Sequence, residues 1–210
     1  MMKKSILKLA VWMFALPLLF AACSENDSSV DPYENWDVRN QTYIDSIATV
    51  AKANLGDGVG EWKVIRSYKL PPLGLNEVGE VNDNVYCKIV AVGTGDKTPK
   101  FTDNVATNYR GKLVNGTVFD QSYKGVYDPT IATPIEFTLS GVITGWTTAL
   151  QVMKEGDRWE MYIPYNMAYG TSGSGSIPGY STLYFDVDLR KVIAVAENER
   201  SLAAEFEVSE

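Results

Sequence analysis

The second half of the chain consists of short runs that alternate between apolar and polar residues and are separated by turn residues. Alternation with a period of two is typical of β-strands that bury one face. The pair Asn115-Gly116 lies between two such runs and predicts a tight hairpin, because glycine readily takes the positive φ that these turns need. Strands are therefore expected within residues 85–95, 103–122 (a hairpin), 133–140, 158–164 and 181–195.

Helical periodicity is confined to two segments. Apolar residues recur on one face over residues 40–56, and a shorter helix is indicated over residues 147–157. Many strands with one short helix predict an α+β domain over residues 83–193, with the helix packed on the concave face of the sheet. Residues 40–82 are expected to add a helix and a strand that pack onto this domain.

The first 22 residues have the features of a signal peptide. Lys3 and Lys4 precede an uncharged apolar run, residues 9–22, which is too short to span a bilayer comfortably. Cys23 follows directly, and this arrangement resembles the lipobox of bacterial lipoproteins. The resemblance implies acylation of Cys23, a membrane anchor, and an outer-membrane lipoprotein of a Gram-negative bacterium that faces the periplasm or the cell exterior. The alternative is an ordinary secretory signal that happens to contain a cysteine.

Acidic, polar segments are expected at both ends of the folded part. Residues 23–39 are poor in aliphatic side chains and predict a flexible tether behind the acylated cysteine, and residues 194–210 predict an acidic C-terminal tail. Once Lys3, Lys4 and Lys8 are removed with the signal peptide, 16 basic and 26 acidic residues remain, a net charge of −10. Such a surface repels phosphates, so no nucleic-acid partner is expected.

The chain contains no histidine, which excludes histidine metal sites, Ser-His-Asp triads and Cys-His dyads. Neither a metal nor a cofactor is expected. Cys87 lies in a strand-like run and has no disulfide partner if Cys23 is acylated. We interpret it as a small buried side chain, since the alternative, a catalytic thiolate, needs an exposed and electropositive setting.

Short motifs that are uninformative alone follow one another in order through residues 83–193. They are Tyr109-Arg110-Gly111, Gly116-Thr117-Val118-Phe119-Asp120, Pro134-Ile135-Glu136-Phe137, Val142-Ile143-Thr144-Gly145-Trp146, Met153-Lys154-Glu155-Gly156, Ile163-Pro164, Ala168-Tyr169-Gly170, Ile177-Pro178 and 183–189. The ordered series resembles the FKBP-type peptidyl-prolyl cis-trans isomerases. The resemblance implies a half-wrapped antiparallel sheet, with an aromatic pocket for a proline ring between the sheet and a short helix.

The resemblance also assigns roles to residues. Trp146 is expected to form the pocket floor, where Gly145 lets the backbone turn tightly into the helix. The implied catalytic residues are Tyr109, Asp120, Ile143, Trp146 and Tyr169. The implied substrate-binding residues are Phe119, Ile135, Phe137, Val142, Ile177 and Phe185. The implied partners are proline-containing polypeptides, and the implied role is to assist the folding of exported proteins.

Departures from the family pattern leave an alternative open. Ile135 stands where many members have phenylalanine, and Gln121 replaces the commoner serine. The segment 121–133 is long, carries Tyr123 and Tyr127, and is expected near the pocket rim. The alternative is a non-catalytic module that binds proline peptides or a partner on the cell envelope.

Overall fold

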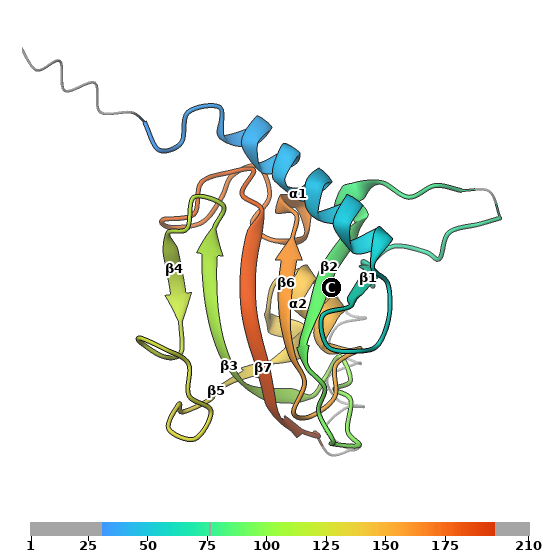
Figure 1. Ribbon diagram of the computed structural model, residues 1–210, viewed down its shortest axis with the longest axis vertical. Helices are drawn as coiled ribbons and strands as arrows, with labels where there is room; N and C mark the ends of the chain where they lie inside the picture. Colours follow the sequence, from blue (N-terminus) through green and yellow to red (C-terminus); the bar gives the residue numbers. More distant parts are fainter. Residues whose placement is uncertain (1–30, 76, 196–210) are drawn as a thin grey trace, which may run out of the picture. The chain divides into compact units, whose positions relative to one another are not determined.

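The computed structural model describes residues 31–75 and 77–195, so the expectations for the signal peptide, for Cys23 and for the chain beyond Val195 fall outside the described residues. Within them, seven strands form one antiparallel sheet in the order β1-β2-β6-β7-β3-β4, and β5 also pairs with β3 (Figure 1). The strands are β1 (Trp62–Arg66), β2 (Asn84–Ala91), β3 (Asn104–Leu113), β4 (Val118–Gln121), β5 (Ile135–Thr138), β6 (Arg158–Ile163) and β7 (Leu183–Ile193). The predicted α+β class is confirmed. No helix in the described ranges is long and apolar enough to cross a membrane.

The strands lie in the runs where alternation predicted them, and β2 shows the reason. Val85, Cys87 and Ile89 point to one face of the sheet and are buried there, while Tyr86 is buried on the opposite face. The predicted hairpin is present between β3 and β4, and Gly116 takes the positive φ of 88°. Both faces of the central strands are therefore covered by apolar packing.

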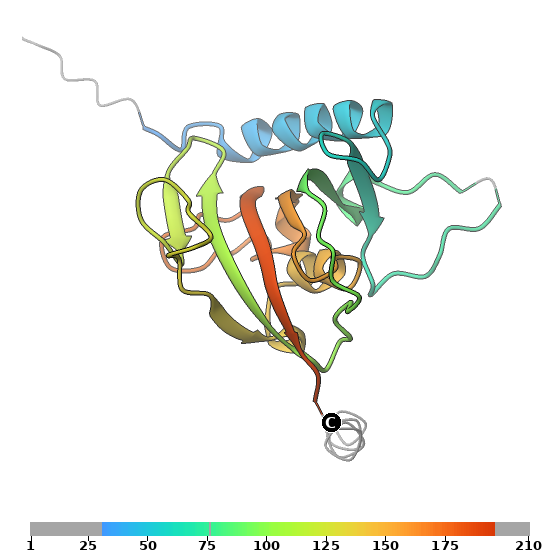
Figure 2. The ribbon, with the colours of Figure 1, turned by 60° about the horizontal axis from the view of Figure 1, so that its bottom comes forward.

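The helix α2 (Thr144–Leu150) covers one face of the sheet, which curves around it (Figure 2). Its buried side chains Trp146, Ala149 and Leu150 join the main core. The sheet supplies the remaining core residues, among them Val85, Val105, Tyr109, Trp159, Met161, Leu183, Phe185, Val187 and Leu189. The predicted packing of a short helix against the curved sheet is confirmed.

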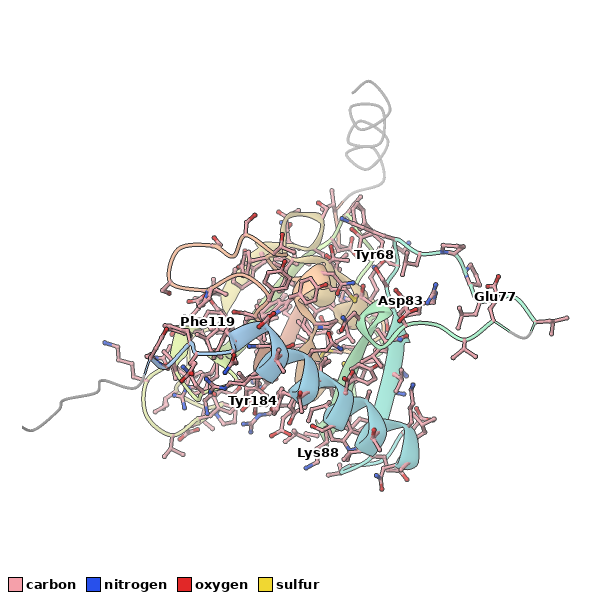
Figure 3. The ribbon with its side chains drawn as sticks, turned by 90° about the horizontal axis from the view of Figure 1, so that it is seen from above. Tyr68, Glu77, Asp83, Lys88, Phe119 and Tyr184 are labelled. Atoms are coloured by element: carbon pink, nitrogen blue, oxygen red, sulfur yellow. The ribbon has the colours of Figure 1, made fainter. Side chains whose placement is uncertain are left out.

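The helix α1 (Trp36–Ala53) covers the opposite face. Ile44, Ala48 and Ala51 pack against aromatic rings of the sheet and form a second cluster with Trp62, Tyr86 and Tyr162, with Tyr184 partly buried beside them (Figure 3). The ring of Trp62 stacks on that of Tyr162 with centroids 5.5 Å apart. The sheet is thus enclosed between two helices, and β1 extends it by pairing with β2.

The expected tether, residues 23–39, is wrong at its C-terminal end. The helix α1 begins at Trp36, because this side chain is buried against the domain and adds an N-terminal turn to the expected helix. The helix ends at Ala53, three residues before the expected stop at Gly56. Composition indicated a tether because Trp36 stands among acidic and polar neighbours in a segment with few aliphatic side chains.

The helix α2 ends at Leu150, earlier than expected, since Gly156 was the predicted stop within the stretch 147–157. The buried carboxylate of Asp157 accepts hydrogen bonds from the N–H of Lys154 at 2.8 Å and from the N–H of Gly93 at 2.6 Å. These bonds hold residues 154–157 in a turn, and Gly156 takes a φ of +90° within it. A side chain that captures backbone N–H groups locally competes with helix continuation.

Gly145 was expected to let the backbone turn tightly into the helix, and this reason for the glycine is wrong. Gly145 lies inside α2, and a Cβ atom at this position would overlap the Cγ2 atom of Ile163 on β6. Glycine is therefore needed because the helix approaches the sheet closely, and no unusual turn is involved.

We expect Gly145→Ala to destabilise the protein by about 1–3 kcal/mol, because the added methyl group must push α2 away from Ile163. Gly141→Ala is the matched control, since a Cβ atom there meets no other atom within 4 Å. Urea denaturation monitored by circular dichroism measures both variants. Equal stability of the two variants would contradict this account of the close approach.

Candidate functional site: an aromatic pocket beside α2

A pocket with a cavity volume of about 290 Å³ opens at the N-terminal end of α2. Strands β3, β4, β5 and β7, the chain entering α2, the helix itself and the loop before β7 all contribute to it. The lining residues are Tyr109, Asp120, Phe137, Gly141, Val142, Ile143, Trp146, Tyr169 and Phe185. All five expected catalytic residues and three of the six expected substrate-binding residues are therefore brought together.

Trp146 lies at the floor of the pocket and is 4% exposed. Three rings meet it edge to face: Tyr109 at 5.3 Å, Phe137 at 5.6 Å and Phe185 at 5.2 Å between centroids. The Nε1 atom of Trp146 has no hydrogen-bond partner among the described residues. Aromatic packing alone thus fixes the orientation of the indole, although a buried indole N–H usually finds a partner.

The polar edge of the pocket is formed by Tyr109 and Asp120. The hydroxyl of Tyr109 donates a hydrogen bond of 2.8 Å to Asp120, and its backbone N–H donates one of 2.9 Å to the hydroxyl of Ser122. The other carboxylate oxygen of Asp120 accepts the N–H of Gln121 at 2.8 Å. Both side chains are consequently held in one orientation at the cavity wall.

Both tyrosine hydroxyls of the pocket stay protonated well into the alkaline range. Burial raises the pKa of Tyr109 most, and the hydrogen bond to Asp120 and the charge of Asp120 raise it further. Burial also raises the pKa of Tyr169, followed by the charge of Asp120. The pocket can therefore offer neutral O–H donors beside one carboxylate.

Three of the expected substrate-binding residues do not line the cavity. Phe119 does not line the cavity and packs edge to face on Phe185, with ring centroids 5.4 Å apart. Ile135 is 40% exposed at the start of β5, and Ile177 is buried in the core. Ile135 and Phe137 are two residues apart on β5 and share one face of the strand, so alternation alone could not tell them apart. The register of β5 on β3, which the sequence did not specify, places Ile135 opposite Thr107 and Phe137 opposite Val105.

Gly141 lines the pocket and was missed by the sequence analysis. It ends the short 3-10 helix Leu139–Gly141, and its lack of a side chain leaves the entrance open. The only sequence signal was its place at the start of the run that contains Val142 and Ile143.

The segment 121–133 was wrongly expected near the rim. Tyr123 lies under the guanidinium of Arg110 at 4.5 Å, and Tyr127 lies under that of Arg158 at 4.6 Å. The hydroxyl of Tyr127 also donates a hydrogen bond to Asp188. Because Arg110 follows Tyr109 on β3, it points to the opposite face of the sheet, and both tyrosines are held on that face.

Cys87 is fully buried on β2 and unpaired among the described residues, as interpreted from the sequence. Burial strongly raises the pKa of its thiol. A protonated and inaccessible thiol is a poor nucleophile, so this cysteine offers no covalent chemistry to the pocket.

Comparison with known proteins adds to this geometry. Residues 95–190 match the family model described as FKBP-type peptidyl-prolyl cis-trans isomerase. The macrophage infectivity potentiator of Trypanosoma cruzi is 44% identical over 117 residues, which are 55% of each chain. The FKBP-type 22 kDa peptidyl-prolyl cis-trans isomerase of Escherichia coli is 40% identical over 117 residues, which are 55% of this chain and 53% of that protein.

A solved structure agrees with the fold. The crystal structure of FkpA from Escherichia coli superposes with a TM-score of 0.55 at 32% identity, and the match covers 78% of this chain and 63% of that one. The chain spans about half the length of the curated relatives named above.

We expect the pocket tyrosines to titrate above the ordinary tyrosine pKa of about 10. The pKa of Tyr109 and of Tyr169 is higher in the folded state than in the unfolded chain. The protonated tyrosines therefore contribute to the free energy of unfolding below about pH 10, and this contribution is lost as the pH rises through the folded-state pKa. Ultraviolet difference spectroscopy and urea denaturation between pH 8 and pH 12 measure both effects. The stability of Tyr109→Phe is expected to fall less steeply with pH than that of the wild type. Identical titration curves for the folded and the urea-unfolded protein would contradict the prediction.

Proposed function

Because residues 95–190 are a domain of the FKBP family of peptidyl-prolyl cis-trans isomerases, we propose that the protein catalyses the rotation of X–Pro peptide bonds in its substrates. The observation that carries the proposal is the open cavity above Trp146, enclosed by the rings of Tyr109, Phe137 and Phe185. A proline ring is compact and apolar, and it fits a hollow of this chemistry.

The reaction requires neither a nucleophile nor a metal. Resonance between nitrogen and carbonyl creates the rotation barrier of about 18–20 kcal/mol, and twisting the bond removes that resonance. The twisted amide carries less charge separation than the planar one. An apolar pocket therefore disfavours the planar form relative to the transition state, and this difference lowers the barrier.

Two donors are proposed to hold the substrate carbonyls during rotation. They are the backbone N–H of Ile143, which directly precedes α2, and the hydroxyl of Tyr169, which is half-buried at the rim. Asp120 keeps the Tyr109 ring in place through the 2.8 Å hydrogen bond. Donors fixed before the substrate arrives stabilise a twisted amide without reorganising.

We expect Trp146→Leu to lower kcat/KM for a proline tetrapeptide about tenfold or more, because the flat floor is lost. Tyr169→Phe removes one hydrogen bond to the substrate, worth about 1 kcal/mol, and should lower kcat/KM about fivefold. A cis-to-trans assay on the fragment that starts at Ser24 measures both. Tyr68→Phe is the matched control, since the ring of Tyr68 contacts that of Phe101 and does not line the pocket.

The assay also separates the alternative function. If the folded fragment binds proline peptides but does not accelerate their isomerisation, the protein is a binding module and not an enzyme. Segment 121–133 offers such a module an exposed apolar surface, since Val126 is 93% and Ile131 79% exposed. A folded fragment that does neither would overturn the proposed function as a whole.

The proposed setting is the bacterial cell envelope. A signal peptide over residues 1–22 and acylation of Cys23 would place the domain on the outer membrane through a tether, where it would assist the folding of exported proteins. X–Pro isomerisation takes tens to hundreds of seconds unaided, which is slow enough to limit folding. A catalyst without a cofactor suits a compartment that lacks ATP.

We expect Cys23→Ser to abolish incorporation of labelled palmitate and to release the protein from the membrane fraction, since multiple acyl chains provide the anchor. Cys87→Ala is the control and should keep the label, because Cys87 is buried within the domain. Label retained in Cys23→Ser would contradict the lipoprotein assignment. Protease treatment of intact cells then distinguishes a surface-facing from a periplasm-facing domain.

A further inference from the structure

The rim of the pocket is carried by the loop that follows the 3-10 helix Tyr165–Met167 and leads into β7. This loop contains Tyr169 near its start and Ser181 and Thr182 at its end. Its backbone is closed on itself: the N–H of Gly173 donates to the carbonyl of Tyr169 at 3.1 Å, and the N–H of Tyr180 donates to that of Gly170 at 3.0 Å.

The loop is also too tightly packed to deform easily. A Cβ atom at Gly179 would overlap the carbonyl oxygen of Thr171, and one at Gly173 would overlap the carbonyl of Ile177. Tyr180 adopts a φ of +61°, which is uncommon for a residue with a side chain. A loop of this kind moves as one body, so whatever holds one end also positions Tyr169.

The helix α1 holds that end. The indole Nε1–H of Trp36 donates a hydrogen bond of 2.9 Å to the hydroxyl of Ser181, which in turn donates one of 2.6 Å to the carbonyl of Pro178. The chain of bonds therefore runs from α1 into the loop that forms the pocket rim.

A second link lies one helical turn further along α1. The side-chain oxygen of Asn40 accepts the backbone N–H of Thr182 at 2.7 Å, while its amide group donates to the carbonyl of Trp36 at 2.7 Å. Asn40, Ser181 and Thr182 are 1%, 3% and 1% exposed. Water cannot replace buried bonds of this kind, so losing one partner leaves a costly unpaired group.

These contacts involve only the first turns of α1. Further along, Ile44, Ala48 and Ala51 pack on the sheet and make no contribution to the loop. The helix also lies outside residues 95–190, the part of the chain that matches the family model. The packing of α1 on the sheet through these apolar residues would be possible without the hydrogen bonds from Trp36 and Asn40 to the loop. Those bonds therefore call for an explanation of their own.

We propose that α1 is a positioning element of the pocket, in which Trp36 and Asn40 fix the loop Ala168–Thr182 and thereby hold Tyr169 over the cavity. The claim that this positioning supports catalysis rests on the proposed isomerase function. The claim that α1 holds the loop in place does not depend on that function.

Trp36→Phe tests the proposal in the whole chain, since it keeps an aromatic ring and removes the N–H donor together with part of the buried indole. We expect the amides of Gly173 and Tyr180 to exchange their hydrogens roughly tenfold faster, while the amides of β3 and β7 keep their rates. Ile44→Val is the matched control: it removes a buried methyl group from the same helix, at a side chain that packs on the sheet and makes none of the hydrogen bonds to the loop, and it should leave the loop amides unchanged. Ser181→Ala removes the hydroxyl that accepts the hydrogen bond from Trp36 and donates to Pro178. This variant replaces Trp36→Phe should that one not fold.

The catalytic readout is a double-mutant cycle with Tyr169→Phe. We expect Trp36→Phe alone to lower kcat/KM about three- to fivefold, no more than the loss from Tyr169→Phe itself, and to lower it less than twofold when Tyr169 is already phenylalanine. Equal losses in both backgrounds would show that Trp36 does not act through Tyr169 and would overturn the proposal. Unchanged hydrogen exchange of the loop amides in Trp36→Phe would overturn it as well.

A wild-type protein without isomerase activity would refute the proposed function, and the exchange experiment would still decide whether α1 holds the loop.

Discussion

The edge-to-face packing of three rings around Trp146 is the interaction on which the rest of the site depends. Tyr109, Phe137 and Phe185 come from three different strands, and Trp146 comes from the helix that these strands enclose. Each such aromatic pair contributes about 0.5–1.5 kcal/mol beyond the area that it buries. The same contacts that join α2 to the sheet therefore also build the floor and walls of the cavity, and stability and site share one set of side chains.

The close approach of α2 to β6 makes this arrangement possible. Gly145 lets the helix lie directly on Ile163, so the indole one residue later reaches the rings of the sheet. The polar edge is equally constrained, because Tyr109 is bound to Asp120 through its hydroxyl and to Ser122 through its backbone. The result is an apolar hollow with few polar groups at its edge, an environment that reduces the free-energy difference between a planar amide and a twisted one.

The two helices divide the work on the two faces of the sheet. The helix α2 builds the pocket, and α1 closes the other face through Ile44, Ala48 and Ala51. Only the first turns of α1 reach around the sheet to the loop before β7, through Trp36 and Asn40. A helix that the sequence presented as a cover is thus also connected by hydrogen bonds to the rim of the site.

The sequence by itself determined the α+β class, the strand runs and the hairpin at Gly116, because these follow from local alternation and turn chemistry. The resemblance carried by the ordered motifs implied eight of the residues that line the pocket. It could not determine the end of α2, which depends on Asp157 capturing the N–H of Gly93 from 64 residues away. The resemblance placed Phe119, Ile135 and Ile177 at the pocket, but they do not line the cavity, since strand register and loop packing decide where each side chain lies. The burial of Trp36 and the place of Tyr127 were likewise decided by tertiary structure alone, because their partners Ser181 and Asp188 are distant in the chain and only the folded sheet brings them into contact.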